Sequence, residues 1–127
     1  MPGGHETILV VEDEAGVLSF VAEALRSVGY MVLEAADGPT ALTLAEQTPG
    51  LDLILTGVVL PFGLTGRQVA DRIRDDRPDL KVLFTSGYAK NAIVHQGRLD
   101  EGVELLMKPY TRDVLVCRVR FVLDDLG

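Results

Sequence analysis

The chain alternates between two kinds of segment, and this alternation limits its possible folds more than any other feature. Short runs of apolar, β-favouring residues are followed by stretches whose apolar residues recur at helical spacing. The runs that predict strands are Ile8–Val11, Met31–Ala35, Leu53–Thr56, Lys81–Thr85 and Val103–Met107. The stretches that predict helices are 17–28, 39–48, Arg67–Asp76, 89–95 and Thr111–Asp124. Because right-handed crossovers place helices on both faces of a parallel sheet, we expect an α/β fold with a five-stranded parallel sheet flanked by five helices.

Length and composition fit one compact domain. The chain has 127 residues and is 47% hydrophobic, which is ample for a packed core. The Pro/Gly-punctuated connections, such as Pro49-Gly50, are short, and no linker divides the sequence. We therefore expect a single domain over residues 1–127, with residues 1–6 flexible.

Charge and hydropathy narrow the classes of partner. Nineteen acidic residues against twelve basic ones give a net charge of -7, which repels nucleic acid. No apolar run approaches the ~20 residues that span a bilayer, so we expect no membrane insertion. The single cysteine, Cys117, cannot form an internal disulfide and agrees with a reducing compartment. We expect a cytoplasmic protein.

The residues that follow the predicted strands are chemically distinctive. Glu12 and Asp13 follow the first strand, Gly57 the third, Ser86 the fourth and Lys108 the fifth. In open parallel sheets these carboxyl ends carry the functional groups. Adjacent carboxylates suit Mg²⁺, which prefers oxygen ligands. A hydroxyl and an ammonium group suit the oxygens of a phosphoryl group.

Four sequence segments in register resemble the receiver (response-regulator) domain of two-component signalling. These segments are Ile8–Glu14, Asp52–Pro61, Val82–Ala89 and Met107–Tyr110, with Gly66 between the second and the third. The resemblance covers nearly the whole chain and implies a flavodoxin-like (CheY-like), doubly wound sheet with strand order 2-1-3-4-5. The stretch from Tyr88 to Thr111 also resembles receivers of hybrid sensor histidine kinases.

The resemblance assigns a role to each residue at the strand ends. It implies that Glu12 and Asp13 hold Mg²⁺, that Ser86 and Lys108 contact the phosphoryl group, and that Gly57 stands at the phosphoacceptor position. In the family, the backbone carbonyl of the residue at the position of Val59 binds the metal. An aromatic residue often stands three positions before the lysine in signalling receivers, whereas this chain has Leu105 there.

Gly57 decides what chemistry is available. The family's reaction needs a carboxylate oxygen to attack phosphorus, and glycine has none. The loss of that carboxylate also removes one expected ligand, so Mg²⁺ binding is expected to be weak. Two other interpretations of Gly57 remain open from the sequence: it accommodates the backbone at a strand end, or it replaces an aspartate deliberately in order to block phosphorylation.

The leading hypothesis is a degenerate receiver that acts as a phosphorylation-independent protein-interaction module and is not an enzyme. Its expected partner is a histidine kinase, a phosphotransfer protein or another receiver, contacted through segments 89–95, 103–107 and 111–124. We expect a monomer or weak dimer. One alternative is a conventional phosphoryl-accepting response regulator whose aspartate was mutated. Another is a small-molecule or metal-binding module built on Glu12, Asp13, Ser86 and Lys108.

Overall fold

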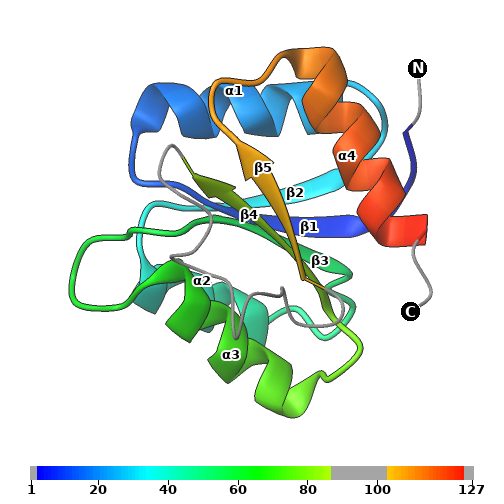
Figure 1. The fold of residues 1–127 in the computed structure, drawn as a ribbon. Helices are drawn as coiled ribbons and strands as arrows, with labels where there is room; N and C mark the ends of the chain where they lie inside the picture. Colours follow the sequence, from blue (N-terminus) through cyan, green and yellow to red (C-terminus); the bar gives the residue numbers. More distant parts are fainter. Residues whose placement is uncertain (1–2, 87–102, 125–127) are drawn as a thin grey trace.

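The computed structural model describes residues 3–86 and 103–124, and its centre is a parallel sheet of five strands (Figure 1). The strands are β1 (Thr7–Val11), β2 (Met31–Ala35), β3 (Leu53–Gly57), β4 (Lys81–Ser86) and β5 (Val103–Met107). Their order across the sheet is β2-β1-β3-β4-β5, and every neighbouring pair is parallel. The predicted doubly wound fold and strand order are confirmed.

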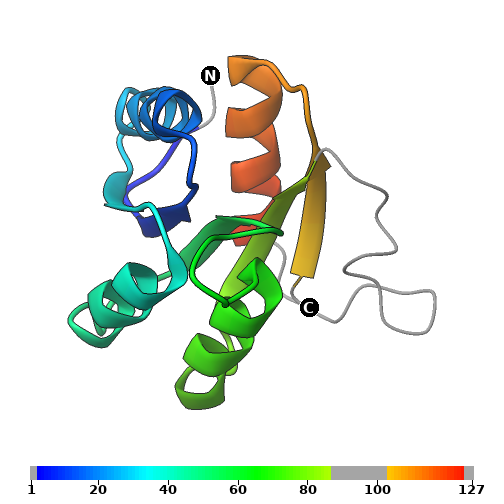
Figure 2. The ribbon, with the colours of Figure 1, turned by 90° about the vertical axis from the view of Figure 1, so that its left-hand side faces the viewer.

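Helices cover both faces of the sheet. They are α1 (Ala15–Arg26), α2 (Gly38–Glu46), α3 (Gly66–Asp76) and α4 (Arg112–Asp124). Helices α1 and α4 lie on one face and α2 and α3 on the other (Figures 1 and 2). The predicted helix 89–95 lies outside the described residues. In the described part of the chain, no helix has the length and apolar character that crossing a membrane requires.

Alternation along the strands divides the core between the two faces. Ile8 and Val10 of β1 pack with the side of the sheet that α1 and α4 cover, whereas Leu9 and Val11 pack with the α2 and α3 side. All four side chains are at most 1% exposed. A strand buried on both faces is an unbroken apolar run, which is the pattern that predicted it.

Side-chain caps mark the starts of α2 and α3. Thr65 and Gln68 form a reciprocal capping box at the start of α3, and the Asp37 side chain accepts a hydrogen bond of 2.8 Å from the Thr40 amide at the start of α2. Helix α1 begins two residues before the predicted Val17. Its first two residues, Ala15 and Gly16, are exposed and do not belong to the apolar periodicity on which the prediction depended.

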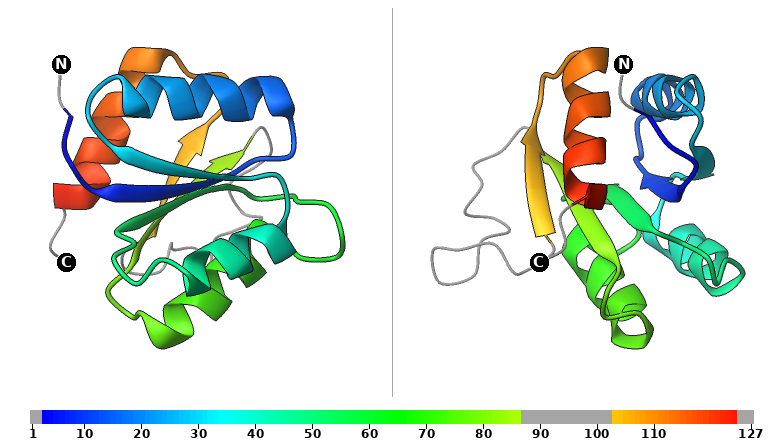
Figure 3. Two further views of the ribbon diagram at one scale, coloured as in Figure 1. Left: turned by 180° about the vertical axis from the view of Figure 1, so that it is seen from behind. Right: turned by 90° about the vertical axis from the view of Figure 1, so that its right-hand side faces the viewer.

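Arg120 joins the last helix to the beginning of the chain. Its guanidinium donates to Glu6 at 2.7 Å, to Asp124 at 2.7 Å, to the Gly3 carbonyl at 3.0 Å and to the Tyr30 hydroxyl at 3.3 Å. The blue start of the chain and α4 lie side by side in Figure 3. The hydrogen bonds from Arg120 lower the pKa of Glu6 to about 2 from an ordinary value of 4.5. The Glu6 carboxylate therefore favours the folded chain.

This cluster predicts a pH dependence of stability. Because the pKa of Glu6 is lowered, its contribution is complete above its unfolded pKa and is lost as the pH falls through about 4.5 towards about 2. Urea unfolding curves measured over this acid range should show a steeper loss of stability in the unaltered protein than in Glu6→Gln. The other carboxyl groups are present in both proteins, so their contributions to the pH dependence of stability cancel in the comparison. Parallel losses in the two proteins would contradict the assignment.

Candidate functional site

The carboxyl ends of β1, β3, β4 and β5 converge on one small cavity of about 180 Å³. The cavity is lined by Glu12, Asp13, Glu14, Gly57, Val58, Val59, Thr85, Ser86 and Lys108. Every predicted site residue is therefore in the lining. Three lining residues, Glu14, Val58 and Thr85, were not predicted as site residues. An apolar or hydroxyl side chain near a strand end carries little signal by itself, and the predicted metal ligands were the first two acidic residues after β1.

The two adjacent acidic residues lie in different environments. Glu12 is 5% exposed and Asp13 is exposed. One Glu12 carboxylate oxygen, Oε2, lies 3.2 Å from Lys108 Nζ, and the other, Oε1, accepts a hydrogen bond of 3.3 Å from the Glu14 amide. A buried carboxylate needs such partners, because desolvation without them is costly. Glu12 is therefore held within the fold, whereas Asp13 faces solvent.

Position 57 has room for a side chain. A Cβ built on Gly57 would lie 3.6 Å from Glu12 Oε2, 3.7 Å from the Val59 carbonyl oxygen and 3.9 Å from a Leu60 methyl, all ordinary van der Waals distances. The backbone of Gly57 is not left-handed either, unlike that of Gly29 and Gly63. The interpretation of Gly57 as a backbone accommodation is therefore wrong, because the fold does not require glycine at this position.

Gly66 differs from Gly57. A Cβ at Gly66 would approach the Gly57 carbonyl oxygen to 1.9 Å, a distance that real atoms do not adopt. The Gly66 amide donates to the Val58 carbonyl at 2.8 Å. This close approach seats the start of α3 directly on the end of β3, which gives glycine at position 66 a steric reason.

Strand β5 brings Lys108 to the cavity beside Ser86. Ser86 is 4% exposed, and its carbonyl accepts a hydrogen bond of 2.8 Å from the Lys108 amide. The Lys108-Pro109 peptide is cis. Lys108 and Ser86 therefore line one cavity from neighbouring strands.

The donor set fits a divalent cation only in part. Glu12 and Asp13 supply carboxylates, and the Val59 carbonyl faces position 57, which supplies no oxygen of its own side chain. Within residues 3–86 and 103–124, no group of three His, Cys, Asp or Glu side chains is placed to hold a metal ion. Of the two cavity carboxylates Glu12 and Asp13, Glu12 is already paired with Lys108.

An apolar pocket of about 300 Å³ adjoins the cavity and shares Lys108 with it. Phe20 of α1 and Tyr110 line it, with ring centroids 6.5 Å apart. Burial, with a smaller contribution from the negative charge of Glu12, raises the pKa of Tyr110 to about 12. Among the described residues, the buried Tyr110 hydroxyl has no hydrogen-bond partner. This pocket was not predicted from the sequence, because nothing there distinguishes Phe20 from an ordinary residue of the predicted helix.

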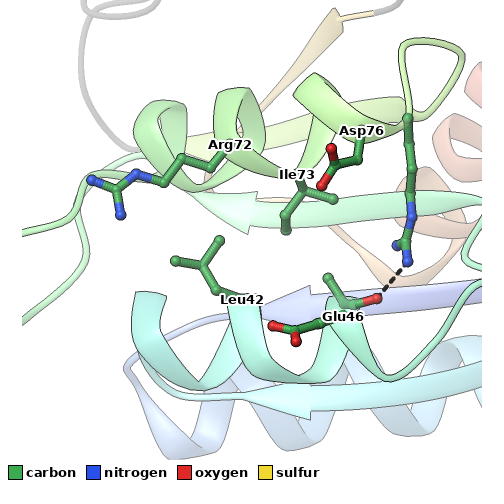
Figure 4. A pocket seen from close by; sticks show the side chains of 7 residues that line it. Leu42, Glu46, Arg72, Ile73 and Asp76 are labelled. Atoms are coloured by element: carbon green, nitrogen blue, oxygen red, sulfur yellow. Dashed lines mark hydrogen bonds between the residues drawn. The ribbon is translucent and has the colours of Figure 1, made fainter.

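A larger groove of about 430 Å³ lies between α2 and α3, away from the carboxyl ends of the strands (Figure 4). Leu42 and Ile73 line it together with the charged side chains Glu46, Arg72 and Asp76. At one end an Arg77 nitrogen donates to the Ala45 carbonyl at 2.6 Å, the hydrogen bond dashed in Figure 4. None of the predicted site residues contributes to this groove.

The sequence matches the model of the response regulator receiver domain over residues 8–120. Together with the strand order and the converging strand ends, this match shows that the chain belongs to the receiver domain family. Receiver domains are signalling modules of two-component systems.

Among receivers, the chain is similar to those of hybrid kinases. It is 36% identical to the sensor kinase CckA of Brucella abortus strain 2308 over 122 residues, which are 95% of this chain and 13% of the kinase. The crystal structure of the receiver domain from hybrid histidine kinase CckA has a TM-score of 0.80 and 38% identity, and the match covers 93% of this chain and 99% of that one.

Other relatives have different overall lengths. The response regulator receiver protein CpdR of Brucella abortus is 31% identical over 103 residues, which are 81% of this chain and 84% of CpdR. The chain spans 47% of YrkP of Bacillus subtilis and 53% of TcrX of Mycobacterium tuberculosis, two transcriptional regulatory proteins.

Restoring a carboxylate at position 57 should destabilise the metal-free protein. The new charge in Gly57→Asp would lie near Glu12 Oε2, which is 3.6 Å from the Cβ position. Lys108 and water offset part of the repulsion, so we expect a loss of about 1 to 2 kcal/mol relative to Gly57→Asn. The asparagine variant is the control, because replacing a strand glycine is itself stabilising. Equal unfolding midpoints in chelator would refute this prediction.

Proposed function

We propose that this chain is a degenerate receiver that works as a protein-interaction module without phosphorylation of its own aspartate. Gly57 is the observation that carries the proposal. It lies at the end of β3, inside the cavity that also contains Lys108 and Ser86, and it offers no oxygen to attack phosphorus. The chain is then a binding partner in a phosphorelay and not an enzyme.

The charge arrangement around the cavity supports this proposal. Phosphoryl transfer to a receiver needs a nucleophilic carboxylate, a metal ion and a cation to offset charge on the phosphoryl oxygens. Here the cation, Lys108, is paired with the buried Glu12. The neighbouring Thr56 hydroxyl does not replace the nucleophile, because it is fully buried and bonds to the Gly57 carbonyl. In this proposal the chain as it stands does not accept a phosphoryl group.

Exposed apolar side chains on α4 and β5 support binding to a protein. Val114 and Phe121 of α4 are 47% and 59% exposed, and Met107 at the end of β5 is 44% exposed. We propose that a histidine kinase, a phosphotransfer protein or another receiver contacts this surface. The proposal includes a cytoplasmic location, a monomer or weak dimer, and no binding of nucleic acid, which the charge of -7 disfavours.

Two other functions remain candidates on specific observations. The room for a side chain at position 57 is compatible with a conventional response regulator whose aspartate was replaced. The acidic lining of the cavity is compatible with a metal-binding module, in which Glu12, Asp13 and the Val59 carbonyl would hold Mg²⁺ weakly.

Phosphorylation by a small donor tests the proposal directly. The unaltered protein and Gly57→Asp are incubated with Mg²⁺ and acetyl phosphate, and the intact mass is read for one added phosphoryl group. We expect the variant alone to gain this mass. That result would mean that the lack of a carboxylate at position 57 is all that prevents phosphorylation. A gain by neither protein would point to further loss of the site and still favour a binding role. A gain by the unaltered protein would overturn the proposal.

Calorimetric titration with Mg²⁺ distinguishes the metal-binding alternative from the proposed function. We expect the unaltered chain to bind Mg²⁺ at least tenfold more weakly than Gly57→Asp does, because it lacks one of three carboxylate ligands. Asp13→Asn in the Gly57→Asp background should weaken binding again. Equal affinities of the unaltered protein and Gly57→Asp would favour a metal-binding function that does not use position 57.

A further inference from the structure

The loop between β3 and α3 carries a backbone conformation that its residue does not favour. Phe62 has a φ of 65° and the following Gly63 a φ of 82°. Glycine adopts the left-handed region freely, whereas the Cβ of a bulky aromatic residue clashes there with its own backbone. Successive left-handed positions normally hold glycine, asparagine or aspartate. Phe62 is therefore an outlier within this turn.

Packing within the chain does not compensate for this strain. Phe62 is 77% exposed, which makes it the most exposed large apolar side chain in the described residues. Val59, on the same loop, is 64% exposed and lines the cavity at Gly57. The green loop that follows β3 extends away from the sheet and from α3 (Figures 1 and 3). Both the backbone energy and the hydration energy of the free chain would improve if residue 62 were small or polar.

The charges beside this loop indicate what kind of surface could cover it. Asp13 and Glu14 are exposed at the same cavity, and Lys108, its only cation among the described lining residues, is paired with Glu12. The whole chain carries a charge of -7. A second copy would bring like charges together, whereas a surface with basic side chains around an apolar pocket complements this edge.

We propose that Phe62, with Val59 beside it, is the apolar anchor by which a partner protein docks over the mouth of the Gly57 cavity. The partner offers an apolar pocket for the phenyl ring and basic side chains opposite Asp13 and Glu14. This surface is separate from the exposed side chains of α4. The inference rests on the proposed function, since it adds a second contact surface, besides the one on α4 and β5, for the signalling partner proposed there. It also gives a reason for a strained aromatic residue at this position.

Substitutions at residue 62 separate anchoring from folding. Phe62→Asn removes the ring and keeps a residue that tolerates the left-handed region, so its unfolding midpoint should equal or exceed that of the unaltered protein. Phe62→Tyr keeps the ring. Met31→Gln is the matched control, because Met31 is 64% exposed on the edge strand β2. A lower midpoint for Phe62→Asn would overturn the proposal, since the ring would then belong to the fold.

Binding is measured by calorimetry against the purified histidine kinases, phosphotransfer proteins and other receivers of the native cell. We expect Phe62→Asn to raise the Kd for the partner roughly tenfold to a hundredfold, as the loss of an aromatic anchor does. Phe62→Tyr and Met31→Gln should leave it within about twofold. If a partner binds Phe62→Asn as tightly as the unaltered chain, the anchor is overturned and the proposed function stands. If no member of the set binds the unaltered chain, both are overturned.

Discussion

The ion pair between Glu12 and Lys108 organises the functional edge of the sheet. It joins the end of β1 to the end of β5, two strands that β3 and β4 separate in the sheet. The same carboxylate accepts the amide of Glu14 at the start of α1. One buried anion therefore holds two strand ends and a helix start together around position 57. The side chain of Glu12 is only 6% exposed and that of Lys108 is 30% exposed, so removing either partner would leave a poorly solvated charge.

Much of this arrangement could be predicted from the order of residues along the chain. The apolar runs fixed the strands, and the parallel topology then required Glu12, Gly57, Ser86 and Lys108 to meet at one edge. The environment of each group could not be predicted in the same way. Adjacent Glu12 and Asp13 are equivalent in the sequence, and only the turn after β1 decides that one is buried and the other exposed.

Two other features depend on geometry that periodicity does not encode. The left-handed φ of Phe62 follows from how the loop between β3 and α3 closes, and residue identity would have predicted the opposite. The Tyr110 hydroxyl has no hydrogen-bond partner among the described residues, and its burial depends on how the turn after β5 packs against α1. Both features lie in connections between regular elements. Tyr110 lines the pocket that shares Lys108 with the cavity, and Phe62 lies three residues beyond Val59, which lines the cavity itself.

The contrast between Gly57 and Gly66 separates two kinds of constraint. At position 66 any side chain would collide with the backbone of β3, so the fold itself demands glycine there. At position 57 a Cβ would meet its neighbours at ordinary van der Waals distances, so the backbone accepts other residues. A change at position 57 therefore alters the charge inside the cavity while the path of the chain is kept, and these two properties can vary separately.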